Sequence, residues 1–169
     1  MKRYILALVA VALAASVATP VVSSASKRHS EVLGFDVMAP VVEPYTGTAN
    51  PIREVPGGGL PWEIDSAKGE LHRDGKLEVE VEGLVLARRA PVPEAQQGTN
   101  PIPSFKAIVS CLSATDGAAT TVNVSTDLFP ATASGDAEIE ATVALPSPCF
   151  APIVFVTSPN GAWFSVTGT

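Results

Sequence analysis

The chain has 169 residues, which is enough for one domain and little more. Its formal net charge is −6, only 17% of its residues are charged and it has no basic stripe. Nucleic acid and anionic membrane surfaces are therefore poor candidates as partners. Hydrophobic residues make up 46% of the chain, and valine, threonine, proline and glycine are plentiful. This mixture favours a β-rich extracellular domain over a helical one.

The N-terminus predicts a secretory signal peptide, residues 1–25. Two basic residues precede an apolar run over residues 4–15, and small residues follow it, which is the order of regions in export signals. Cleavage after Ala18 or after Ala25 satisfies the small-x-small rule, and the second site is preferred. An uncleaved anchor is the alternative, although the run is short of the roughly 20 apolar residues that a spanning helix needs. We therefore expect a secreted or extracytoplasmic (cell-envelope) protein with no membrane span after signal removal.

Residues 26–59 predict an extended Pro/Gly-rich arm or linker. Four prolines and Gly57-Gly58-Gly59 oppose helices and most strands in this stretch. Residues 32–42 are apolar enough to dock as an edge strand, and a disordered tether is the alternative. The folded domain is expected to start at Leu60.

The clearest strand signal covers residues 76–86. Apolar residues alternate with glutamates in its first half, and this period of two is typical of a half-buried strand with one solvated face. We interpret Glu78, Glu80 and Glu82 as that solvated face, which also protects the strand from edge pairing.

The hairpin before this strand has two possible loops around an Asp-Gly pair. A two-residue loop places Leu71 opposite Glu78 and mixes the two faces. A three-residue loop closed by Gly75 pairs Leu71 with Leu77 and keeps the apolar face whole. We therefore predict the three-residue loop, in which the pairing of Glu70 with Glu78 is a small cost.

Turn signals separate about seven short strands, and no mature helix is indicated. This pattern predicts an all-β fold, a single β-sandwich over residues 60–169 of Ig-like or Greek-key size. The strands are expected within residues 60–72, with an interruption near 66–69, and within residues 76–86, 105–112, 120–125, 137–145, 153–157 and 162–167.

The last hairpin is closed by a Pro-Asn-Gly turn with glycine at the position of positive φ. The register that follows turns Trp163 and Phe155 to the face away from the core. The predicted pairs are Thr157 with Trp163, Val156 with Phe164, and Val154 with Val166.

Three aromatic residues are the candidate ligand-binding residues: Trp163, Phe155 and Trp62. An outward Trp163 beside Phe155 would stack on a sugar ring, as the aromatic platforms of carbohydrate-binding modules do. The alternative is that the arm or a loop covers Trp163, or that it lies in the core, and this is favoured because tryptophan is usually largely buried. Trp62 follows Pro61 at a strand entrance, where it would plug the end of the sandwich or, less often, bind a partner.

The two cysteines, Cys111 and Cys149, predict one disulfide, because an even pair in an exported protein is most simply bridged. Cys111 shares its strand face with Phe105 and Val109, so the bridge is expected between core strands. The alternative, a redox or metal site, lacks a CxxC spacing and a nearby histidine.

No catalytic residue, metal site or cofactor is predicted. The sequence has no GxSxG or HExxH motif, no metal-spaced histidine pair and no DxDxDG loop. Its histidines are His29 in the arm and His72 beside a turn, and neither predicts a catalytic triad. Glu63 with Asp65 across a cleft is the candidate pair for an alternative function, a small carboxylate-dependent hydrolase.

Two stretches, GGLPWEIDSAKGELHRDGKLEVEVEGLVL and CFAPIVFVTSPNGAWFSVTG, resemble segments of uncharacterised predicted-secreted bacterial proteins. The resemblance covers most of residues 57–169 and implies no activity. We therefore expect an exported, non-enzymatic β-sandwich that binds a glycan or an extracellular protein. The expected surfaces are the Trp163 face and the long loop over residues 88–103. A purely structural or assembly domain is the further alternative.

Overall fold

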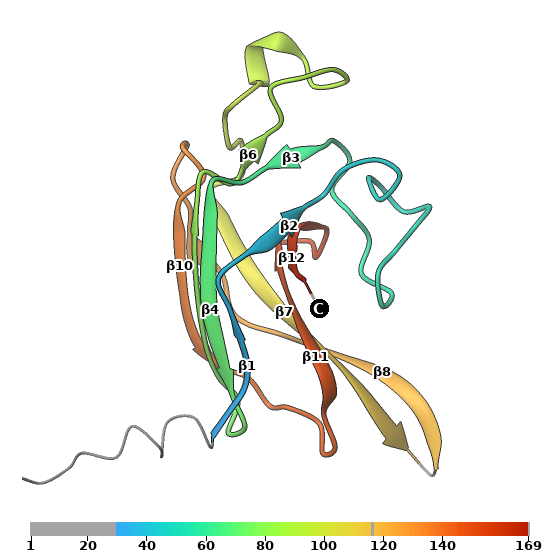
Figure 1. The fold of residues 1–169 in the computed structure, drawn as a ribbon. Helices are drawn as coiled ribbons and strands as arrows, with labels where there is room; N and C mark the ends of the chain where they lie inside the picture. The colour runs from blue at the N-terminus through green and yellow to red at the C-terminus, as the bar shows by residue number, and fades with distance from the viewer. Residues whose placement is uncertain (1–29, 116, 169) are drawn as a thin grey trace, which may run out of the picture.

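The structure is a computed structural model that describes residues 30–115 and 117–168. The predicted signal peptide and His29 lie outside the described residues. A four-stranded and a six-stranded antiparallel sheet enclose one hydrophobic core, and a small two-stranded sheet lies at one end (Figure 1). The prediction of an all-β sandwich is confirmed.

The four-stranded sheet has the strand order β1-β4-β5-β10. Leu71 pairs with Leu77 and Glu70 with Glu78, so the predicted three-residue loop between β4 and β5 is confirmed. Gly75 closes this loop with a φ of +89°, which favours glycine. The strands are β1 (Glu31–Phe35), β4 (Ser66–His72), β5 (Lys76–Glu82) and β10 (Ala137–Thr142).

The six-stranded sheet has the order β2-β12-β11-β7-β8, and β9 pairs with β7 beside the start of that strand. The strands β7 and β11 occupy its middle, which is why both contain many buried β-branched and aromatic residues. The strands are β2 (Met38–Pro40), β7 (Ser104–Thr115), β8 (Ala118–Ser125), β9 (Phe129–Pro130), β11 (Phe150–Thr157) and β12 (Trp163–Thr167).

A short pair of strands, β3 (Trp62–Glu63) and β6 (Val85–Leu86), closes one end of the sandwich (Figure 1). Trp62 stacks on Phe164 with 3.8 Å between ring centroids, and it meets the edge of Phe105 at 6.4 Å. The expected interruption of the first strand falls at residues 64–65 rather than near 66–69, because β3 pairs with β6 while β4 joins the four-stranded sheet. The long loop that follows β6 contains one 3-10 turn, η1 (Glu94–Gln96).

Residues 30–59, which were expected to form an arm or linker, take part in both sheets. Strand β1 pairs with β4, and strand β2 pairs with β12. Residues 41–58, which we call the covering segment, continue beside β12. The Trp163 N–H donates to the Pro56 oxygen at 2.9 Å, and the Gly58 N–H donates to the Trp163 oxygen at 2.8 Å. The sandwich therefore begins at β1 and not at Leu60.

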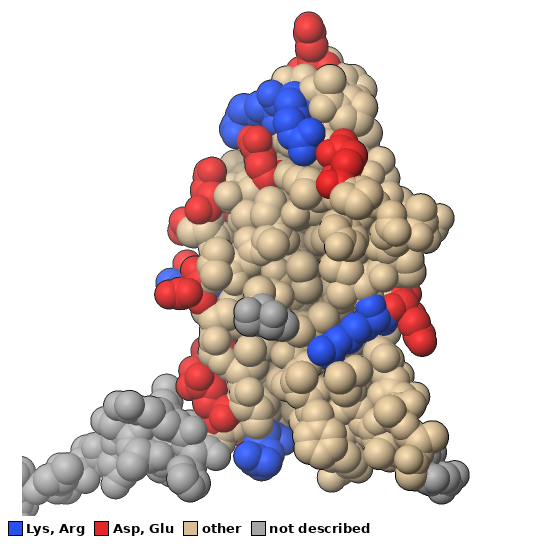
Figure 2. Space-filling model, turned by 45° about the vertical axis from the view of Figure 1, so that its right-hand side comes forward, with Lys and Arg blue, Asp and Glu red and all other residues tan. Residues whose placement is uncertain are grey.

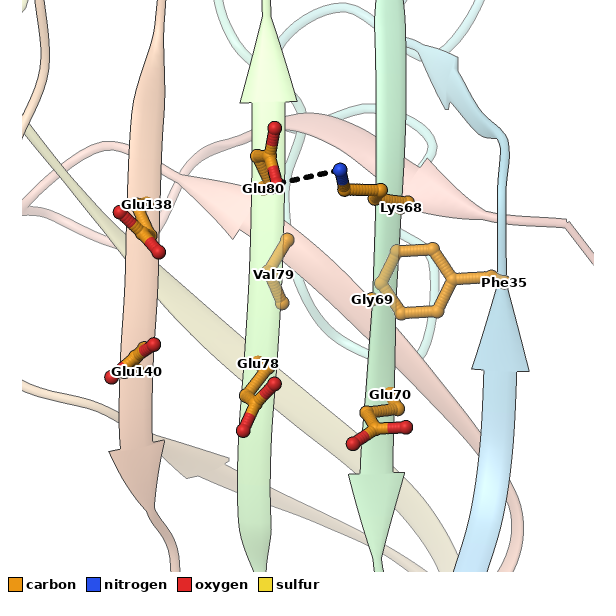
Figure 3. Close-up of a pocket in the computed structure, with 9 residues that line it drawn as sticks. All are labelled: Phe35, Lys68, Gly69, Glu70, Glu78, Val79, Glu80, Glu138 and Glu140. Atoms are coloured by element: carbon orange, nitrogen blue, oxygen red, sulfur yellow. Dashed lines mark ion pairs between the residues drawn. The ribbon is translucent and has the colours of Figure 1, made fainter. Parts of the chain in front are cut away.

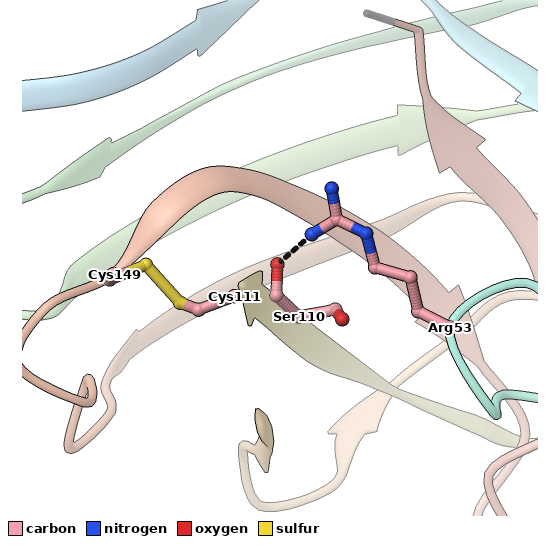
Figure 4. The surroundings of a disulfide bond; sticks show 4 residues. All are labelled: Arg53, Ser110, Cys111 and Cys149. Atoms are coloured by element: carbon pink, nitrogen blue, oxygen red, sulfur yellow. Dashed lines mark hydrogen bonds between the residues drawn. A yellow bond between two sulfur atoms is a disulfide. The ribbon is translucent and has the colours of Figure 1, made fainter. Parts of the chain in front are cut away.

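The tip of the covering segment lies against β7 and β8. Arg53 Nη1 donates to the backbone oxygen of Ser110 at 2.9 Å (Figure 4), and Asn123 Nδ2 donates to the Arg53 oxygen at 2.9 Å. Burial lowers the pKa of the Arg53 guanidinium. Arg53 and Glu54 have φ values of +47° and +69°, which side chains other than glycine rarely adopt. These contacts hold the segment over the six-stranded sheet.

The last hairpin differs from its predicted register. Its first pair agrees with the prediction, but the pairs predicted for Val154 and Phe164 are wrong. A register shift makes Phe164 an extra residue in β12, and this is the residue that stacks on Trp62. Bulges of this kind re-aim a side chain. The observed pairs are Thr157 with Trp163, Val156 with Ser165, and Phe155 with Val166.

Cys111 and Cys149 form a disulfide, with their Cα atoms 5.0 Å apart (Figure 4). The predicted bridge is confirmed. It joins β7 to the residue just before β11, and these two strands also pair directly.

Asp136 ties the turn after β9 to the end of β5. Its carboxylate accepts hydrogen bonds from the Ser134 hydroxyl at 2.7 Å and from the Gly83 N–H at 3.0 Å. The bond from Ser134, and next that from Gly83, lowers the pKa of Asp136 below its ordinary value of 3.8. The folded protein therefore favours the ionised carboxylate.

Asp136→Asn is expected to lower the free energy of unfolding at pH 7 by about 1 kcal/mol, because the amide loses the charge and one acceptor. A carboxyl whose pKa falls on folding stabilises the protein above its unfolded pKa, and this contribution is lost as the pH falls through the folded pKa. The difference from the parent protein should therefore shrink below about pH 4. Urea unfolding at a series of pH values measures it, with the exposed Asp127→Asn as control. A difference that stays constant into strong acid would contradict this role.

Candidate functional site

Charged side chains occupy alternate positions of β4, β5 and β10 on the solvent-facing side of the four-stranded sheet. Strand alternation sends Val79 and Ile139 into the core and turns the glutamates between them to solvent. Figure 2 shows acidic side chains along this side of the molecule. We call it the acidic face, and it consists of Lys68, Glu70, Lys76, Glu78, Glu80, Glu82, Glu138 and Glu140.

Two rows of charged side chains cross the acidic face from β4 over β5 to β10 (Figure 3). Three of the four neighbouring pairs in these rows join like charges. Directly opposed like charges destabilise a sheet, so this pattern costs stability. The rows are Glu70-Glu78-Glu140 and Lys68-Glu80-Glu138.

A shallow groove of about 310 Å³ lies at these rows, and Phe35 forms part of its wall (Figure 3). Phe35 is half-buried and comes from the edge strand β1, where it pairs with Gly69. A Cβ atom at Gly69 would lie 2.6 Å from Phe35 Cζ and still closer to the backbone oxygen of Glu78. Glycine is therefore required for the ring to lie there. The groove combines an aromatic wall with a carboxylate rim.

Both lysines of the acidic face are held by glutamates. Lys68 Nζ lies 2.8 Å from Glu80 Oε2, and Lys76 forms an ion pair with Glu78. The hydrogen bond from each of these glutamates, followed by its charge, raises the pKa of its lysine above the ordinary value of 10.5. More distant glutamates add to both shifts. Because five glutamates and one lysine line the groove, the field over it is negative.

His72 positions one carboxylate of the rim. Its Nε2 lies 2.8 Å from Glu70 Oε1, and its Nδ1 lies 3.0 Å from Ser30 Oγ. The ring is buried, with 8% of the residue exposed. His72, the last residue of β4, therefore helps to fix the position of the Glu70 carboxylate.

The carboxylate pair considered for a hydrolase is not brought together in one groove. Glu63 binds Arg88, accepting from its backbone N–H at 3.1 Å and from its guanidinium. Asp65 lines a second groove, of about 540 Å³, which Glu63 does not line and which also contains Asp136. The pKa of Asp136 is lowered, the opposite of what a general acid needs at neutral pH. The structure gives no support to the pair Glu63 and Asp65.

The three aromatic residues expected to bind a ligand lie inside the protein. The exposed fraction is 2% for Trp163, 0% for Phe155 and 3% for Trp62. Phe155 and Trp163 lie against each other with 6.1 Å between ring centroids, and the covering segment runs along Trp163. The aromatic platform is therefore wrong, because these rings offer no surface to a sugar, and the favoured alternative, in which the arm covers Trp163, is confirmed.

Sequence reasoning missed Phe35 as a residue of the site. The residue belongs to the apolar stretch that predicts an edge strand, which was the available signal. Its place in the groove depends on the pairing of β1 with β4, and the addition of Glu138 and Glu140 depends on the pairing of β10 with β5. Neither pairing follows from the sequence.

Comparisons of the chain with protein-family models, curated proteins and solved structures found no match. Within residues 30–115 and 117–168, no helix has the length and apolar character needed to cross a membrane. In the same residues, no group of three or more His, Cys, Asp or Glu side chains is placed to hold a metal ion. The fold and the site define an all-β sandwich with one disulfide and an acidic groove.

Proposed function

We propose that this chain is an exported, non-enzymatic binding module whose acidic face binds a positively charged segment of an extracytoplasmic protein. The observation that carries the proposal is the set of directly opposed glutamates beside the Phe35 groove. The disulfide is compatible with an extracytoplasmic location, where such bridges form and persist.

A basic peptide segment matches the chemistry of the groove in two ways. Its ammonium and guanidinium groups would enter the negative field between the two rows and relieve their repulsion. Its methylene stems would pack on the Phe35 ring, with a cation–π contribution from the charged ends. A neutral glycan would use the ring and leave the repulsion in place, so we favour the peptide.

Glu138 and Glu140 are the carboxylates to test, because both are exposed on the edge strand β10 and neither is a core residue. The double substitution Glu138→Gln and Glu140→Gln is expected to weaken binding of a lysine hexapeptide about tenfold. Titration calorimetry measures this. Affinity of the parent protein should fall between about 20 mM and about 300 mM salt, because screening weakens exposed charges.

The matched control removes two charges elsewhere, at Glu54 and Glu94, which lie outside the acidic face. It should bind the hexapeptide like the parent protein. Equal weakening by both double variants would mean that net charge alone governs binding, and would refute a site on the acidic face. Binding of a neutral oligosaccharide in place of the peptide would refute the proposed ligand class.

A further inference from the structure

Strand β8 forms one edge of the six-stranded sheet, and no other described strand pairs with its outer side. It is eight residues long, and its residues are exposed or half-buried. Alternate backbone N–H and C=O groups of such a strand point away from the sheet. A long edge of this kind is a template for pairing with another chain.

The chemistry of β8 differs from that of β1 and β10, the edges of the four-stranded sheet. Its sequence, AATTVNVS, has no charged residue and no proline, and charge is also absent from the flanking Gly117 and Thr126. The edges of the four-stranded sheet carry Glu31 on β1, and Glu138 and Glu140 on β10. Charged side chains on edge strands oppose edge-to-edge pairing. Only the β8 edge lacks this protection among the described edges formed by β1, β8 and β10.

An apolar patch lies beside this edge. Leu112 is 43% exposed and Phe150 is 61% exposed. Phe150 pairs with Leu112, which pairs with Thr121 of β8, so the three residues form a row across β11, β7 and β8. In Figure 2 the lower right of the molecule is a surface of uncharged side chains. Exposed apolar surface of this kind marks protein contacts.

We propose that β8 pairs with β8 of a second copy of this chain, antiparallel and about a two-fold axis. Two identical edge strands can pair antiparallel about a two-fold axis, because the free N–H groups of each then face the free C=O groups of the other. The chain is acidic overall, but its glutamate rows lie on the other sheet of the sandwich. Two copies therefore meet through uncharged strands, while the glutamate rows of both lie on the four-stranded sheets, away from the contact. The pairing does not depend on the function proposed for the acidic face.

Sedimentation equilibrium of the oxidised protein tests the pairing. The weight-average mass is expected to rise about twofold between about 5 µM and about 500 µM. The edge variant carries Ala119→Lys and Thr121→Lys, which place charges on β8 and on its symmetry mate. It should remain monomeric over the whole range. A control with Thr142→Lys and Ala144→Lys adds the same charge at the end of β10 and should dimerise like the parent protein.

Hydrogen exchange separates this pairing from other contacts. Amides of β8 should become protected as the protein concentration rises, while amides of β10 should not change. A parent protein that stays monomeric at about 500 µM would overturn the proposal, and so would dimerisation of the edge variant. A monomer whose β8 amides are protected by an added extended peptide would assign the edge to a foreign strand, which also overturns pairing between copies.

Discussion

Trp163→Ala is expected to lower the free energy of unfolding by about 3–5 kcal/mol, the usual cost of removing a large buried aromatic side chain. The residue is 2% exposed and its indole lies against Phe155. Both the backbone N–H and the backbone oxygen of Trp163 form hydrogen bonds with the covering segment. The cavity would lie where that segment joins the six-stranded sheet, so the loss should reach the covering segment as well. Urea unfolding followed by circular dichroism measures the effect.

Trp163→Phe is the matched control. The indole N–H has no hydrogen-bond partner among the described atoms, so phenylalanine loses volume without losing a bond. Its cost should stay below about 2 kcal/mol. If Trp163→Ala kept full stability and lost only affinity for a glycan, Trp163 would be a binding residue and the packing described above would be refuted.

Removal of the disulfide has the second large expected effect. The double substitution Cys111→Ala and Cys149→Ala should lower the free energy of unfolding by about 4 kcal/mol, because the bridge closes a loop with a sequence separation of 38 and so restricts the unfolded chain. The measurement is urea unfolding of the oxidised parent protein and of the double variant.

A reducing agent supplies the internal control for this effect. Reduction should destabilise the parent protein to the level of the double variant and should leave that variant unchanged. A double variant as stable as the oxidised parent would show that pairing of β7 with β11 already holds this region together, and that the bridge adds nothing to it.

The two hairpins show which part of the fold follows from the sequence. The register of β4 with β5 is set by residues next to the turn, since only one loop length keeps Leu71 and Leu77 on the core face. The register of β11 with β12 is not local. Phe164 leaves the regular ladder and stacks on Trp62, which belongs to another sheet. A turn signal cannot predict a bulge that distant packing fixes.

The composition of residues 30–59 did not indicate that they belong to the sandwich. Proline and glycine predict an arm without partners, but β1 and β2 pair with strands far along the sequence, and Pro56 and Gly58 bond to the backbone of Trp163. That pairing buries Trp163, which by alternation alone faces outward. The glutamates of β5 could be recognised as a solvated face because alternation along one strand is a local pattern. The groove could not be recognised, because it also needs Phe35 from β1 and Glu138 from β10, which distant strand pairing brings together.

The most direct test of the account is a map of where a basic peptide binds. Amide chemical shifts of the ¹⁵N-labelled protein would be followed as the lysine hexapeptide is added. The account predicts shifts in β5 (Lys76–Glu82) and β10 (Ala137–Thr142), with the Phe35 amide among them. Shifts confined to the covering segment or to β8, or no shifts at all, would contradict the claim that the acidic face is the binding surface.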